Sequence, residues 1–146
     1  MKKVLKTGLL LSLFALFTAS CVEEHYTNTD VWTFFQEYEV GTRNSKLQWS
    51  YDEIDDLFFC TVYIDKLTNQ VYREGILAGY FVDFIDGRKV NSPLPYSQFF
   101  VDKGGYQWSY QYTCEFSPGR VTFIFRDSDY AVDTPPGCTF LVKMMR

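Results

Sequence analysis

Two apolar segments joined by a short connector constrain the fold more than any other feature of the sequence. They span residues 57–64 and 76–84, and both are rich in the β-branched and aromatic residues that strands favour. The connector at 65–74 is too short for a parallel crossover within one sheet, which needs a dozen or more residues. The sequence therefore predicts that the chain passes here from one sheet to a facing sheet.

The connector itself has the pattern of one helical turn. Thr68 is placed to cap the turn at its start, and Leu67 and Tyr72 have the spacing of a hydrophobic staple. Gly75 stands where the chain must leave the turn. We expect one short helix near residues 68–74.

Other strand patterns recur at regular intervals along the chain, at 31–40, 47–51, 88–90, 98–101, 108–116, 121–126 and 139–145. Asp86-Gly87 and Pro118-Gly119 are hairpin and type II turn signals. About eight short strands with no long amphipathic helix predict an all-β fold, a single antiparallel β-sandwich of immunoglobulin-like architecture. A barrel is the alternative.

The strand at 108–116 has the clearest alternation in the chain. Its polar residues at 109, 111, 113 and 115 are typical of a wet sheet face. The opposite face is apolar, so we expect it to lie inside; its residues are Trp108, Tyr110, Tyr112, Cys114 and Phe116. Trp32 and Trp49 also alternate with polar neighbours, which predicts core positions for all three tryptophans.

Residues 1–20 have the composition of a secretory signal peptide. Three lysines precede an apolar core at 8–17 that is too short to span a bilayer. The core ends in Thr-Ala-Ser before Cys21, and small residues before a cysteine resemble the lipobox of bacterial lipoproteins. The resemblance implies cleavage before Cys21 and a diacylglycerol on its thiol. Ordinary cleavage, with Cys21 incidental, is the alternative.

The mature chain would consist of a lipidated tether at 21–30 and one domain at 31–146. Without the three signal lysines, 11 Lys and Arg stand against 18 Asp and Glu, a net charge of −7. Such an acidic chain argues against a nucleic-acid partner and against attraction to anionic lipid head groups. Its membrane contact would be the two or three acyl chains of a lipoprotein, which anchor stably. We expect it at the outer membrane of a bacterial cell envelope, in either leaflet.

A second resemblance covers 32–146 and is concentrated between residues 63 and 96. The segments are YIDKLTNQV at 63–71, GILAGY at 75–80 and LPY at 94–96. They are similar to the pattern D-x-P-x-I-T-x-x-V, G-x-V-x-x-Y and L-P-Y of a group of small Bacteroidetes lipoproteins. Here Lys66 replaces the proline and Leu67 the isoleucine. The resemblance implies a β-sandwich and an envelope address, and no activity.

Three cysteines follow the lipidation site. Cys60 and Cys114 each fall on the apolar side of a strand, which makes them a candidate disulfide in an oxidising envelope and leaves Cys138 over. Two buried free thiols are the alternative. The spacing of the cysteines matches no metal motif, and we expect no cofactor.

Asp127, Asp129 and Asp133 supply hard oxygens in one loop and are the weak candidates for calcium. Calcium requires six to eight oxygens, and the loop lacks the glycine and terminal glutamate of an EF-hand. A solvated turn is the favoured interpretation.

Catalysis has few candidate residues. The single histidine, His25, lies in the tether, where it cannot be held within hydrogen-bond reach of a nucleophile. A carboxylate pair from 52–56, Asp83 and Asp86 remains as the alternative, since glycoside hydrolysis needs only two acids at a set separation. We expect no enzyme.

Aromatic residues next to turns and out of phase with the core are the candidate ligand-facing side chains: Phe35, Tyr96, Phe99, Tyr106 and Tyr130. An exposed cluster of these would bind a partner such as a glycan or an envelope protein. The leading hypothesis is a lipid-anchored, non-catalytic binding or assembly module. The alternatives are a carboxylate-based glycan hydrolase and a strand-donating structural subunit.

Overall fold

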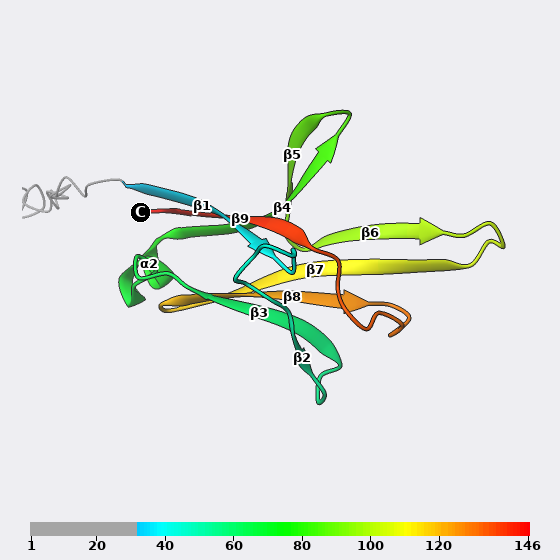
Figure 1. Ribbon diagram of the computed structural model, residues 1–146. Helices are drawn as coiled ribbons and strands as arrows, with labels where there is room; N and C mark the ends of the chain where they lie inside the picture. Colours follow the sequence, from blue (N-terminus) through cyan, green and yellow to red (C-terminus); the bar gives the residue numbers. More distant parts are fainter. Residues whose placement is uncertain (1–31) are drawn as a thin grey trace, which may run out of the picture. The chain divides into compact units, whose positions relative to one another are not determined.

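Two antiparallel sheets form the protein between residues 32 and 146, the part of the chain that the computed structural model describes (Figure 1). One sheet has the order β1 (Thr33–Val40), β9 (Cys138–Met145), β4 (Ile76–Ile85) and β5 (Arg88–Pro93). The other has the order β2 (Ser50–Asp52), β3 (Leu57–Tyr63), β8 (Arg120–Asp127), β7 (Gln107–Ser117) and β6 (Tyr96–Val101). The sheets share no strand, which confirms the predicted sandwich.

The predicted step between sheets is confirmed at the connector. β3 belongs to the five-stranded sheet and β4 to the four-stranded sheet, and α2 (Asn69–Glu74) lies between them. The Thr68 hydroxyl accepts a hydrogen bond from the Val71 amide at 3.3 Å, and the Gly75 amide donates to the Val71 carbonyl at 2.8 Å. Leu67 and Val71 are buried, so the helix closes one end of the core.

The core lies between the sheets and consists of every second residue of the central strands. Phe123 on β8 and Phe140 on β9 stack with ring centroids 4.2 Å apart, which joins the two sheets at their centre. Tyr112 on β7 is only 1% exposed and packs against Phe81 and Phe125. These strands find their partners within 32–146, so this part of the chain forms one compact unit.

Trp108 lies outside this core, and its predicted core position is therefore wrong. β8 ends at Asp127, which pairs with Tyr110, so the first residues of β7 extend beyond it. There Trp108 is half-buried and stacks on Phe100, at 5.3 Å between ring centroids. Because β6 and β7 project as a long hairpin, this tryptophan has no facing sheet to pack against (Figure 1).

Cys60 and Cys114 do not form the candidate disulfide, and Cys138 is also a free thiol. Cys60 on β3 and Cys114 on β7 both pair with Phe123, from opposite sides of β8. Two strand spacings separate their Cα atoms by about 9–10 Å, whereas a disulfide spans less than about 7 Å. The alternative of free thiols in the apolar interior is the observed one.

The sandwich has two distinct ends. The α2 end holds the start of β1, the β3–β4 connector, the β7–β8 turn and the last residues of β9, at 32–35, 63–76, 117–120 and 143–146. The loop end holds the opposite connections, at 52–57, 85–88, 101–107 and 127–138. Figure 1 shows α2 at one side of the molecule and the β6–β7 tip at the other.

The predicted signal peptide at 1–20, Cys21, His25 and the tether lie outside the described residues. Between residues 32 and 146, no helix is long and apolar enough to cross a membrane.

Candidate functional site

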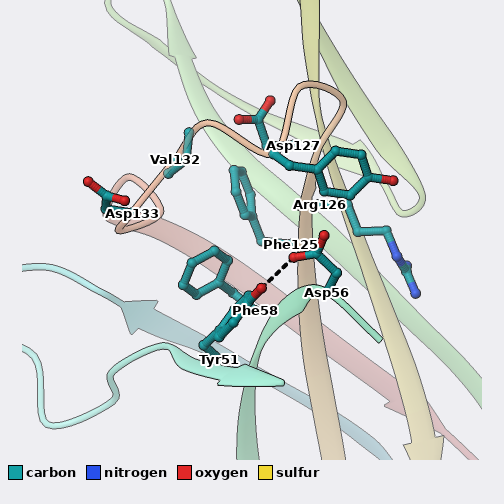
Figure 2. A pocket seen from close by; sticks show the side chains of 9 residues that line it. Tyr51, Asp56, Phe58, Phe125, Arg126, Asp127, Val132 and Asp133 are labelled. Carbon is teal, nitrogen blue, oxygen red and sulfur yellow. Dashed lines mark hydrogen bonds between the residues drawn. The ribbon is translucent and has the colours of Figure 1, made fainter. Parts of the chain in front are cut away.

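A cleft of about 340 Å³ opens at the loop end, between the β2–β3 connection and the segment that follows β8 (Figure 2). Its lining residues are Tyr51, Asp56, Phe58, Phe125, Arg126, Asp127, Tyr130, Val132 and Asp133. The strand register brings these two segments together, because Phe58 near the start of β3 pairs with Phe125 near the end of β8. Tyr51 pairs in turn with Phe58.

Aromatic rings form the inner surface of the cleft. The Tyr51 and Phe58 ring centroids are 5.0 Å apart, and those of Phe58 and Phe125 are 6.2 Å apart. Phe125 is buried in the core, so it fixes the position of Phe58. Tyr130 is 73% exposed and lies at the rim. The cleft therefore combines a rigid aromatic base with an accessible aromatic side chain.

Asp56 is held at one side of this aromatic base by a hydrogen bond from the Tyr51 hydroxyl (Figure 2). Its backbone is in the left-handed region, with φ of 50°, which turns the chain back into β3. The hydrogen bond to Asp56 is the main cause of a raised pKa of Tyr51, with nearby carboxylates adding to it. Tyr51 therefore stays a neutral hydroxyl.

Asp127 shapes the opposite wall. Its side chain is almost fully buried, and its two oxygens accept hydrogen bonds from the Asp129 amide at 3.2 Å and the Ala131 amide at 3.1 Å. The loop thereby brings Tyr130 to the rim, with φ of 55°. Because both carboxylate oxygens bind the loop backbone, Asp127 has a structural role.

Arg126 lies between the cleft and a second, smaller hollow. That hollow measures about 260 Å³ and lies over the outward side chains of β7 and β8, including Ser109 and Gln111. Arg126 is exposed and takes part in neither of the two ion pairs found among residues 32–146. Its guanidinium is therefore available to a ligand that lies across the edge of the cleft.

The five candidate aromatics do not form one cluster. Tyr130 lines the cleft, while Phe99 and Tyr106 belong to the β6–β7 hairpin. Phe35 lies at the α2 end, on the outer face of the other sheet. Tyr96 is partly buried and stacks on Phe81 at 4.9 Å, so it belongs to the core.

The candidate calcium ligands do not converge. Asp127 binds the loop backbone, and Asp129 accepts hydrogen bonds from the Tyr106 hydroxyl at 2.6 Å and the Ser128 hydroxyl at 2.8 Å. The first of these bonds is the main cause of a raised pKa of Tyr106. Within 32–146, no group of three or more acidic, histidine or cysteine side chains is placed to hold a metal ion.

The carboxylates of the cleft also bear on the hydrolase alternative. Figure 2 shows Asp133 on one side of Phe58 and Phe125 and Asp56 on the other. Asp56 and Asp133 are exposed. Neither side chain lies in an apolar pocket of the kind that encloses a catalytic general acid. The arrangement is better suited to accepting hydrogen bonds from a ligand's hydroxyl groups.

The chain matches no protein-family model, no curated protein and no solved structure. Sequence reasoning missed Tyr51, Phe58 and Arg126, which alternate with neighbours like any strand residue. The signal that could have found them is the pairing of β3 with β8, because it places the acidic loop at 52–56 beside Tyr130.

Proposed function

We propose that this protein is a lipid-anchored, non-catalytic binding module of the bacterial cell envelope, with a glycan as the ligand of the loop-end cleft. The observation that carries the proposal is the composition of that cleft. It places the accessible rings of Tyr51 and Tyr130 beside the carboxylates of Asp56 and Asp133.

Sugar chemistry fits this combination. A pyranose ring has apolar C–H faces that pack on aromatic rings and a rim of hydroxyl groups that donate hydrogen bonds. Carboxylate acceptors form stronger hydrogen bonds than neutral ones. Arg126 adds a planar donor group at the edge of the cleft. A volume of about 340 Å³ is within the range of small-ligand sites.

Anchoring is supported by the sequence before the sandwich. The small residues that precede Cys21 and the resemblance to Bacteroidetes lipoproteins both indicate an envelope address. β1 enters the sandwich at the α2 end, whereas the cleft lies at the loop end. Lipidation at Cys21 would thus leave the cleft at the far end of the domain from the anchored strand.

The ligand class is tested on a glycan array with soluble residues 22–146. We expect binding that is lost in Tyr130→Asn, because asparagine keeps the left-handed backbone and removes the ring. Tyr63→Ala is the matched control, since it removes an equally exposed tyrosine at the α2 end. If wild type binds no glycan, or if both variants lose binding equally, the assignment of the cleft is wrong.

The same samples test the hydrolase alternative. Any bound glycan is incubated with the protein, and new reducing ends are measured. We expect none. Turnover that disappears in Asp56→Asn would make the protein a carboxylate-based enzyme instead.

Anchoring is tested separately by metabolic labelling. We expect the mature protein to partition into detergent and to incorporate a palmitate analogue, and Cys21→Ala to abolish the label. Unmodified protein free in the periplasm would refute the address.

A further inference from the structure

An apolar patch lies on the outer face of the four-stranded sheet, at its α2 end. It consists of Phe35 on β1, Ile76 and Tyr80 on β4, and Met145 on β9. The register places these side chains on one face, because Met145 pairs with Ile76, and Phe35 pairs with Lys143, two positions before Met145. Phe35 is 74% exposed and Ile76 63% exposed. Between them runs a groove of about 330 Å³.

This patch departs from the usual pattern of a sandwich, in which the outer face of a sheet is polar. Along β1 the polar pattern returns at Glu37, which is the next outward position and forms an ion pair with Lys89 on β5. Phe84 is also exposed on this face, at the loop end of β4, but the apolar side chains that line the groove all lie at the end where β1 begins. We propose that this patch rests on the surface of the phospholipid bilayer.

The length of the tether supports the bilayer as the occupant. The inference rests on the anchor at Cys21 proposed above, and Thr33, the first residue of β1, follows Cys21 by twelve positions. Twelve fully extended residues span at most about 40 Å. An anchored domain thus stays within about 40 Å of the headgroups, at an effective concentration on the order of millimolar. A contact that is weak by itself suffices under these conditions.

The charges around the patch also suit a membrane surface. Lys143 lies over the Tyr80 ring at 5.0 Å, and Lys66 lies over the Phe34 ring at 5.5 Å. Lysines beside aromatic rings are typical of side chains at a membrane interface. Arg146 adds a third cation at this end and forms an ion pair with Glu74 at 3.6 Å.

The acidic residues gather at the other end of the sandwich. Residues 32–146 carry 11 Lys and Arg against 15 Asp and Glu. Seven of these acids lie in or beside the two loops that form the cleft: Asp52, Glu53, Asp55, Asp56, Asp127, Asp129 and Asp133. Anionic headgroups would repel that end and attract Lys143 in the patch and the other cations of the α2 end. Docking of the patch would therefore hold the cleft away from the bilayer.

The test uses residues 22–146 with an N-terminal hexahistidine, bound to vesicles of phosphatidylethanolamine, phosphatidylglycerol and a nickel-chelating lipid. Lysine acetylation read by mass spectrometry reports which face is covered. We expect the reactivity of Lys143 and Lys66 to fall several-fold on vesicles relative to solution. Lys46 and Lys103, at the loop end or near it, should not change.

Matched variants identify the patch as the cause. Phe35→Asp with Ile76→Asp should return Lys143 to its solution reactivity, while the protein still binds the vesicles through its tag. Phe99→Asp is the control, because it places the same charge on an 81% exposed ring of the β6–β7 hairpin. Urea melts of each variant verify that the sandwich is folded.

Two results would overturn the inference. Equal reactivity of Lys143 on vesicles and in solution would mean that the patch does not meet the bilayer. Low reactivity of Lys143 already in solution would mean that the chain itself covers the patch. If this protection depends on protein concentration, a second copy covers it; if it does not, residues 22–31 do. In this experiment the tag replaces the lipid anchor. The reactivity of Lys143 on vesicles can therefore be interpreted even if palmitate labelling or glycan binding fails.

Discussion

Gly79 lies where β4 faces β7 of the other sheet and leaves no room for a side chain. It lies on the inward face of β4, and a Cβ atom built on it would lie 2.5 Å from the Cys114 sulfur on β7. The same atom would lie 3.1 Å from a methyl carbon of Leu94. Non-bonded carbon atoms prefer separations of about 3.5–4.0 Å. Gly79→Ala therefore forces the sheets or the Cys114 side chain to move.

The expected cost follows from two opposing effects. Overpacking a core by one methyl group typically costs about 1–3 kcal/mol. Gly79 has an ordinary backbone conformation, so alanine also restricts the unfolded chain and returns roughly 0.4–1 kcal/mol. We expect Gly79→Ala to lower the free energy of unfolding by about 1–2 kcal/mol.

Cys114→Ala distinguishes this clash from a general loss of packing. It removes the sulfur and leaves a Cβ 3.7 Å from the new methyl group, which is ordinary van der Waals contact. In the double variant the methyl fills part of the space left by the sulfur. The cost of both changes together should be smaller than the sum of the single costs by about 1 kcal/mol or more.

Urea melts of wild type, both single variants and the double variant measure this coupling, provided that the m-value is constant. Additive costs would refute the close approach of Gly79 to Cys114. A stabilised Gly79→Ala variant would refute the packing between β4 and β7 altogether.

Three further predictions concern the core, the helix cap and the thiols. Tyr112→Ala should cost about 3–5 kcal/mol and Thr113→Ala less than about 1 kcal/mol in urea melts, since only the first side chain is fully buried; equal costs would reverse the inward face of β7. Thr68→Ala should cost about 1 kcal/mol in the same melts, because it leaves the Val71 amide without its cap. Burial raises the pKa of Cys114 to about 11 and of Cys138 to about 12 from 9.0, so the contribution of these thiols to stability should be constant below about pH 9 and fall as the pH rises towards these values. An alkaline denaturation series that shows no such loss would contradict the burial of both thiols.

The strands, the helix and the turns could be predicted because each depends on residues that are close in sequence. Alternation places Tyr112 and Val62 inside without knowledge of any partner strand. The capped turn at Thr68 needs three neighbouring residues, and the turn at Pro118-Gly119 needs a glycine whose φ is +81°. Each of these features is therefore determined by residues only a few positions away in the sequence.

Trp108 and the cysteine pair could not be predicted in this way. The alternation that predicts an inward Trp108 is real, but it does not show that β7 is longer than β8. Likewise, Cys60 and Cys114 both face the core, yet the strand between them is identified only by the sheet order. Both errors come from the relative lengths and order of strands, which are long-range properties.

The position of the cleft also follows from the long-range pairing of strands. β3 and β8 are antiparallel, so the loop before β3 and the loop after β8 must emerge at the same end of the sheet. The first loop brings Asp56 and the second brings Tyr130, although they are far apart in sequence. Substitutions in either loop leave the paired strands unchanged. A sandwich with this register can therefore vary the surface of the cleft through these two loops while its core, and the start of β1 at the other end, stay the same.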